Sequence, residues 1–459
     1  MKLTQFKLAY QGLCALVLSM AATTSQAATP IEHWQQANGT SIWLASSMGI
    51  PMVDVHVEFD AGGRRDPENK MGLAALAAGL ASKGVLAWKD QPALDEAALG
   101  DAWADLGAEF NIGANADTFA FSLRSLTYPD VLPKAVALAA HQIAAPAFDA
   151  AVAQREIEKT VAALKEAETQ PGYVAGVAYA QAVFGKHPYG AVTTEASLKA
   201  LSIDDLKQFY KTKLNTCHAK VSLVGALTHE QADQVVTQLL EGLQVAGQTS
   251  CPELAAVADP AKLTEAVKKE IPFDSAQAQI FIGQTAIKRS DPDFLKLLVG
   301  NHILGGSGLV SRLSLEVREK KGLTYSIDSY FDPRQSVGSF TISLQTRPDQ
   351  AQQAVDLSMQ VLKDFVEKGP TEEELKAAKA NLIGGFPLRI DSNRNLLDNI
   401  ANIARNGLPL DYLDVWTKKV DAITAEEIRQ AFAAKIQPDK MVTVILGSKP
   451  ANNESRSNF

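Results

Sequence analysis

The sequence lacks a run of basic residues, and beyond its N-terminal region it has no uninterrupted apolar stretch of 18 residues. Lys and Arg number 44 against 52 Asp and Glu, which gives a formal net charge of -8. Without a basic stripe to follow a phosphate backbone, nucleic acid is not expected as a partner. Without a long apolar stretch, stable membrane insertion is not expected either.

Several catalytic motifs are also missing. The seven histidines include no two at i, i+3 or i+4, so no single helix carries a histidine pair for a metal. There is no G-x-S-x-G nucleophile elbow, and the glycines of segment 305–308 are not followed by the Gly-Lys-Ser/Thr of a phosphate-binding loop. No metal ligand set is therefore predicted in this chain.

The composition is that of an ordinary globular protein, with 46% hydrophobic and 21% charged residues. At about 100 to 200 residues per domain, 459 residues predict two to four domains. Residues 1–27 have the three parts of a secretory signal: two lysines, an apolar stretch and a Ser-Gln-Ala cleavage site. They predict export to the periplasm, with 1–27 removed as a signal peptide.

Three cysteines are present, and Cys14 lies within the predicted signal peptide. The other two, Cys217 and Cys251, would meet an oxidising compartment, where a disulfide is possible. The sequence leaves open whether they are bridged or are two buried thiols. Neither belongs to a C-x-x-C pair, so the sequence gives no support for a redox or zinc-ribbon role.

The chain contains an internal duplication. Segment 201–225 recurs as segment 423–447 with a constant offset, so that Ser202 corresponds to Thr424 and Gly225 to Gly447. Each copy has a Ser/Thr N-cap, acidic residues in the first turn, an amphipathic helix and an apolar strand ending at glycine. This predicts two α+β domains of similar architecture. The predicted boundaries are: domain one at 28–243, a linker at 244–262, domain two at 263–447, and a polar tail at 448–459.

Segment 309–326 carries the most informative side chains. Apolar residues at 309, 310, 313 and 317 predict a helix face, and Gly322 stands where a left-handed C-cap belongs. Arg318 would then lie in the last turn and Tyr325 would open the next strand. A guanidinium and a phenol placed together could both donate to one carbonyl oxygen. The alternative is an arginine at a helix dipole and a tyrosine in the core.

These residues carry a family resemblance. The patterns Arg318-Glu319-x-x-Gly322-Leu323-x-Tyr325 and Gly62-x-Arg64-x-Asp66 resemble signatures of the M16 zinc metallopeptidases, the pitrilysin-like and mitochondrial processing peptidase-like family. The resemblance covers nearly the whole chain after residue 27, duplication included. It implies an α+β fold of two tandem homologous α/β-layer domains that form half of a clam-shell chamber.

The zinc positions of that family do not match. Its His-x-x-Glu-His motif corresponds here to Ala75, Ala78 and Gly79, and its distant glutamate ligand to Ala163. None of these side chains holds a metal or moves a proton. The resemblance therefore implies no cofactor in this chain, with zinc expected in a partner subunit.

The Arg/Tyr pair of the family is intact as Arg318 and Tyr325, and the resemblance implies that it contacts the substrate carbonyl. Gly305, Gly306 and Gly308 are predicted to form a flexible loop beside it, with a plain helix turn as the alternative. The chain is thus interpreted as the non-catalytic subunit of a periplasmic heterodimeric zinc endopeptidase. It would be inactive alone and would act on peptides or unfolded polypeptides. The alternative is a structural or peptide-holding scaffold of the same fold.

Overall fold

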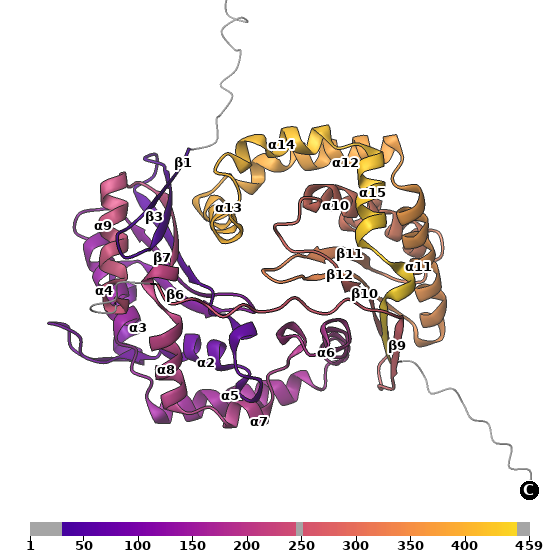
Figure 1. Ribbon diagram of the computed structural model, residues 1–459. Helices are drawn as coiled ribbons and strands as arrows, with labels where there is room; N and C mark the ends of the chain where they lie inside the picture. Colours follow the sequence, from indigo (N-terminus) through magenta and orange to yellow (C-terminus); the bar gives the residue numbers. More distant parts are fainter. Residues whose placement is uncertain (1–29, 245–250, 448–459) are drawn as a thin grey trace, which may run out of the picture.

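The computed structural model describes residues 30–244 and 251–447. The predicted signal peptide (1–27) and polar tail (448–459) lie outside these ranges. Within them, two mixed β-sheets are each flanked by helices (Figure 1). None of the helices in these ranges is both long enough and apolar enough to cross a bilayer.

The first sheet has the order β1-β2-β8-β3-β7-β6. Its strands are antiparallel except for the parallel pair β2 and β8. A two-stranded ribbon, β4 (Gly84–Val85) with β5 (Leu94–Asp95), lies apart from it. The sheet strands are β1 (Ile31–Gln35), β2 (Ser41–Ser46), β3 (Met52–Phe59), β6 (Glu109–Ala114), β7 (Phe119–Leu126) and β8 (Lys220–Gly225).

The second sheet has the order β11-β12-β10-β13-β9, again with one parallel pair, β13 and β9. Written from β9, this order matches β2-β8-β3-β7-β6 of the first sheet strand for strand, and the parallel pair falls at the same place. The predicted duplication is therefore present in the topology. The strands are β9 (Val267–Ile271), β10 (Ala278–Thr285), β11 (Ile327–Asp332), β12 (Ser339–Thr346) and β13 (Val442–Leu446).

The helices repeat in the same way. Ser202 and Thr424 each accept a hydrogen bond from the backbone three residues on, and both close a reciprocal capping box, as the repeated sequence indicates. The first half holds α2 (Leu73–Ala81), α3 (Glu96–Leu106), α4 (Leu132–Ala144), α5 (Ala150–Ala167), α6 (Pro171–Phe184), α7 (Glu195–Lys199), α8 (Ile203–Lys213) and α9 (His229–Leu239). The second half holds α10 (Phe294–Asn301), α11 (Ala351–Lys368), α12 (Glu372–Gly384), α13 (Asn393–Asn406), α14 (Tyr412–Ala422) and α15 (Ala425–Lys435).

Two helices cross between the halves. Helix α6 packs on β10 and β13 of the second sheet, and α13 packs on β8 and β3 of the first (Figure 1). Tyr179 of α6 makes a buried 2.8 Å hydrogen bond with Thr341 of β12. In return, Lys220 of β8 donates to the carbonyl oxygens of Ala404 and Arg405 at the end of α13. The two halves are thus interlocked by a reciprocal exchange of helices.

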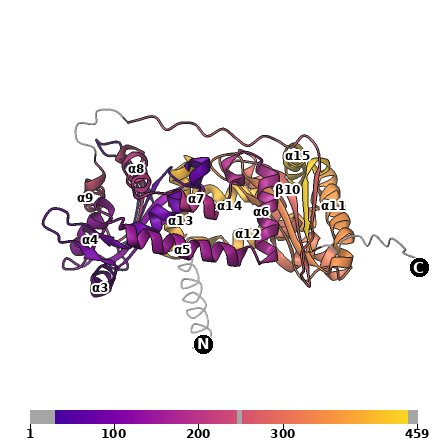
Figure 2. The same ribbon diagram turned by 90° about the horizontal axis from the view of Figure 1, so that it is seen from below.

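The predicted linker is ordered where the structure describes it. Residues 251–266, which we call the connecting segment, run from the first sheet to the second without helix or strand (Figure 2). Arg65 donates to the carbonyl oxygen of Ala255 at 2.7 Å, and Asp259 forms an ion pair with Lys288 at 2.8 Å. A disulfide joins Cys251 at its start to Cys217. The first part of the segment, from Cys251 to Asp259, is therefore tied to the body of the protein.

We expect a cut between residues 245 and 250 to leave the halves together. The two pieces remain joined by the Cys217–Cys251 bond, because the cut lies between these cysteines. A protease site introduced there should give one band on a non-reducing denaturing gel and two bands on a reducing gel. On a native sizing column the cut protein should elute with the uncut protein even when Cys217→Ser removes the bond, since α6 and α13 still interlock. Separation of that variant into two halves would contradict the interlock.

Candidate functional site

Arg318 and Tyr325 lie together at the surface of the second half. Arg318 lies near the end of a π-helical turn, Ser314–Glu319, and Tyr325 precedes β11 by two residues. The guanidinium carbon lies 5.1 Å from the centre of the Tyr325 ring, within cation–π range. Tyr325 is 82% exposed, so the alternative of a core tyrosine is wrong.

The turn before Tyr325 has a local cause. Gly322 adopts φ +61°, and its N–H donates to the carbonyl oxygen of Arg318 at 2.8 Å. This is the left-handed C-cap that the sequence predicted, and a residue with a Cβ would be strained there. It reverses the chain directly after the helix, which brings Tyr325 back beside Arg318.

Arg318 also lines a cavity of about 440 Å³. The walls include polar groups from β11, among them Asp328 and Tyr330, and Asn301 at the end of α10. Asn301 holds the wall together, since it donates to the Ser329 carbonyl oxygen at 2.8 Å and accepts from the Ser329 hydroxyl at 2.7 Å. A cation and hydrogen-bonding groups thus face one space, as recognition of a peptide backbone requires.

The three glycines line the same cavity but do not form the predicted flexible loop. Gly305 and Gly306 end a second π-helical turn, His302–Gly306, that continues α10. Gly305 is buried against β11, where a Cβ would lie 2.3 Å from the Ser329 hydroxyl oxygen. Gly308 follows in a turn with φ +64°. Close packing explains Gly305, and the loop prediction is corrected to a helical turn. π-Helical turns are rare overall, but those that do occur are often found at functional sites.

The prediction for Leu309 and Val310 is also wrong. The sequence predicts them on the apolar face of a helix, but they form a short 3₁₀ turn and are exposed, Val310 by 74%. Ser311 separates this turn from the helix that follows, and its hydroxyl accepts a hydrogen bond from the N–H of Ser314. A Ser N-cap at 311 was the signal in the sequence that excludes 309 and 310 from the helix. Leu315 and Tyr325 are exposed as well, and we call these four apolar residues of segment 309–325 the apolar rim.

The positions of the family's zinc ligands lie in the first half. Ala75 and Gly79 are exposed on one side of α2, Ala78 is buried, and Ala163 is exposed on α5, which packs against α2. A Cβ at Gly79 would meet nothing within 4 Å, so the backbone leaves space for a larger side chain. The residues present do not fit zinc, because none carries a nitrogen, oxygen or sulfur ligand atom in its side chain.

The rest of the first-half signature has a structural role. The Asp66 carboxylate accepts from the N–H groups of Gly72 and Ala74 at 3.0 and 3.1 Å, which caps the start of α2. Burial raises the pKa of Asp66 to about 6, although these backbone donors oppose the shift. Arg64 is buried and forms ion pairs with Asp60 and Asp117. The start of α2 is therefore fixed, although Ala75, Ala78 and Gly79 of this helix carry no metal-ligand atoms.

The molecule thus has a two-domain α+β fold, and the four positions that correspond to zinc ligands carry no ligand atoms. Residues 200–382 match the family model described as peptidase M16 inactive domain. The crystal structure of a peptidase M16 inactive domain from Pseudomonas fluorescens is 31% identical, with a TM-score of 0.85 over 92% of this chain and 99% of that one. The chain belongs to the M16 peptidase family, and it is of the inactive-domain type.

Two relatives carry different descriptions. A protein of Helicobacter pylori called a non-peptidase homolog, YmxG, is 28% identical over 407 residues, covering 87% of this chain and 90% of its own. A Bacillus subtilis protein called an uncharacterized zinc protease, YmxG, is 23% identical over 384 residues, covering 82% and 87%. Relatives of this chain are thus described both as peptidases and as non-peptidases.

Proposed function

We propose that the chain is the non-catalytic subunit of a heterodimeric zinc endopeptidase, exported to the periplasm by residues 1–27. Its Arg318 and Tyr325 would complete the active site of a partner that carries His-x-x-Glu-His. The observation that carries the proposal is a contrast within one chain. The four ligand positions are emptied, whereas Arg318 and Tyr325 are paired at the surface beside a cavity.

The chemistry assigned to this chain is hydrogen-bond donation. The Arg318 guanidinium and the Tyr325 hydroxyl would donate to the scissile carbonyl oxygen of a peptide as that oxygen gains negative charge. Donors fixed in advance at such a position stabilise the transition state more than the ground state. The partner's zinc would supply the Lewis acid and the activated water.

The apolar rim supports a binding role for this surface. Leu309 lines the cavity, and Val310, Leu315 and Tyr325 of the same stretch of chain are also large side chains exposed to water. Exposed apolar groups rimmed by polar residues are typical of surfaces that another polypeptide covers. The occupant would be the partner subunit, the peptide substrate, or both at the edge of the shared chamber.

The second candidate is a scaffold that holds peptides or other subunits without a role in proteolysis. It is favoured by the description of the Helicobacter pylori relative as a non-peptidase homolog. A scaffold needs neither hydrogen-bond donor at Arg318 and Tyr325, so substitutions there separate the two functions.

The partner itself is tested by isolation from the native host. Chromosomally tagged protein purified from periplasm is expected to bring down, in a 1:1 ratio, a second M16 chain whose sequence contains His-x-x-Glu-His. The pair should cleave unfolded polypeptides and lose that activity with a metal chelator, while this chain alone should be inactive. Purification without any M16 partner, or with full peptidase activity of this chain alone, would overturn the proposed function.

A further inference from the structure

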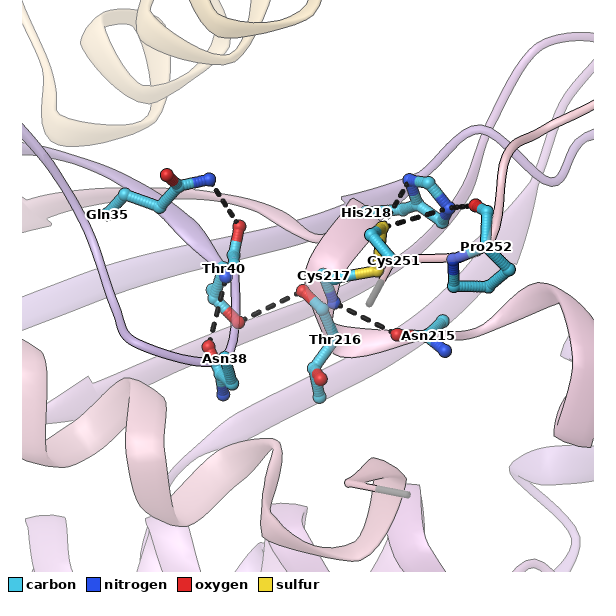
Figure 3. The surroundings of a disulfide bond; sticks show 10 residues. Gln35, Asn38, Thr40, Asn215, Thr216, Cys217, His218, Cys251 and Pro252 are labelled. Carbon is cyan, nitrogen blue, oxygen red and sulfur yellow. Dashed lines mark hydrogen bonds between the residues drawn. A yellow bond between two sulfur atoms is a disulfide. The ribbon is translucent and has the colours of Figure 1, made fainter. Parts of the chain in front are cut away.

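Three side chains of metal-binding type meet where the connecting segment begins. The disulfide joins Cys217 to Cys251 with their Cα atoms 5.7 Å apart, and His218 follows Cys217 directly (Figure 3). The two sulfur atoms and an imidazole nitrogen lie within 4.8 Å of one another. Within residues 30–244 and 251–447, this is the only group of three or more His, Cys, Asp or Glu side chains gathered so closely.

The position of the imidazole suits a shared cation. The Cys251 sulfur lies 3.5 Å from Nδ1 and 3.4 Å from Nε2 of His218. A sulfur and a nitrogen bound to one tetrahedral zinc ion, at about 2.3 and 2.0–2.1 Å, are themselves about 3.6 Å apart. The separation of Cys251 and His218 is therefore nearly that of two ligands of one metal ion. The sulfur is about equally far from both ring nitrogens, so it must move toward the Nδ1 side when the disulfide opens.

A backbone carbonyl orients the imidazole. The Nε2 of His218 lies 2.6 Å from the carbonyl oxygen of Pro252 (Figure 3). Because a carbonyl oxygen only accepts, Nε2 carries the proton and donates it, which leaves the lone pair of a neutral ring on Nδ1. A ring N–H donated to a backbone carbonyl is the usual support of a metal-binding histidine.

The group also borders open space. Cys217 and His218 line a cavity of about 260 Å³, together with Asp60 from the end of β3. A cation held by two thiolates and one imidazole needs a fourth ligand, and a water molecule can reach it from this cavity. Cys251 is exposed, so an external thiol can reach the disulfide.

We propose that reduction of the disulfide converts Cys217, His218 and Cys251 into a binding site for one thiophilic cation of the Zn²⁺ type. An external dithiol supplies two electrons and two protons, so that the Cys217–Cys251 bond breaks, two thiols form and the dithiol becomes a disulfide. Zinc then displaces the two thiol protons and binds both sulfurs and the imidazole. This site is separate from the emptied positions on α2 and α5, and it does not depend on the proposed function.

The test compares zinc binding by oxidised and reduced protein. The full chain carrying Cys14→Ser, which removes the third thiol, is titrated with Zn²⁺ against a chromophoric chelator. The reduced chain is expected to bind one zinc ion, and the oxidised chain none. Co²⁺ added to the reduced chain should give a thiolate charge-transfer band and the intense visible bands of a tetrahedral site.

Substitution of the histidine separates this site from binding to loose thiols. His218→Ala should weaken zinc binding by at least about 10-fold. His229→Ala is the matched control, because this exposed histidine contacts Glu32 and Trp34 and does not belong to the group, and it should bind as the parent does. Circular dichroism verifies that the reduced chain stays folded. Equal binding by oxidised and reduced chains, parental affinity in His218→Ala, or unfolding on reduction would each overturn the proposal.

Discussion

Replacing Tyr325 by Phe is expected to lower the kcat of the two-subunit peptidase by about 10²- to 10³-fold. The change deletes only the hydroxyl. The aromatic ring remains under the Arg318 guanidinium, so the cation–π contact at 5.1 Å is kept. Since Tyr325 is 82% exposed, removal of its hydroxyl oxygen does not disturb the core. The substrate KM and the affinity of the two subunits should stay close to their original values, because the hydroxyl acts on the charge of the transition state.

Arg318→Ala should have an effect of similar size, although it also removes one wall of the cavity. Two controls match these changes in kind. Tyr128→Phe alters an exposed tyrosine of the first half, and Arg347→Ala removes an exposed arginine paired with Asp349. Both should cleave at the parental rate. If Tyr325→Phe and Arg318→Ala also assemble and cleave at that rate, the shared-site proposal fails and the scaffold function takes its place.

Removing the Arg405 side chain is expected to destabilise the fold by about 3–5 kcal/mol at pH 7, because it leaves the Glu58 carboxylate buried and without its main partner. Glu58 is only 3% exposed, and Arg405 reaches it from α13 with Nε 3.1 Å from Oε2. Glu58 and Arg405 lie where α13 packs on the first sheet, so the loss of their ion pair weakens the contact between the two halves. Urea unfolding of Arg405→Ala against the parent measures the effect.

The effect should depend on pH. Burial raises the pKa of Glu58, but hydrogen bonds from His56 and Arg405 outweigh it, so the pKa lies below its ordinary value. A lowered carboxyl pKa contributes stability above the pKa of the unfolded chain, and this contribution is lost as the pH falls through the folded value. Arg405→Ala lacks most of this contribution. The difference in the free energy of unfolding between the variant and the parent should therefore become smaller at acid pH.

A surface arginine of the same helix provides the control for Arg405. Arg394 lies 3.9 Å from Glu109, and both side chains are largely exposed. Arg394→Ala should change stability by at most about 1 kcal/mol. Equal losses for the two arginine variants, or a loss in Arg405→Ala that does not vary with pH, would contradict the role assigned to the buried pair.

Local signals predicted much of the fold. The repeated Ser/Thr caps with their acidic partners, and the apolar strands ending at Gly225 and Gly447, gave the elements and the duplication, because each depends on neighbours in sequence. The exchange of α6 and α13 could not be predicted in this way. An apolar helix face shows that a helix is covered, but not which of two similar sheets covers it.

The sequence likewise predicted one part of the candidate site and not the rest. Arg318, Tyr325 and the C-cap at Gly322 lie within one stretch of chain, and the structure brings them together as that spacing indicates. The cavity walls on β11 were missed, since Asp328 and Tyr330 look like any alternating strand residues. The sequence raised the Cys217–Cys251 bridge but left it open, and the position of His218 beside Cys251 was missed because only the fold brings these residues, 33 apart in the chain, together.

The exchange of helices also determines which contacts can form early, and which late, while the chain is synthesised. Strand β8 ends at Gly225, but its covering helix α13 is complete only at Asn406, about 180 residues later. At about 5–20 residues per second, that is roughly 10–40 s during which the sheet face that carries Glu58 and Lys220 lies without its covering helix. The first half can bury its apolar face under α2, α4, α8 and α9, but the contacts of Glu58 and Lys220 with α13 form only after the second half has been made. The contact between the halves is therefore among the last parts of the fold that can form.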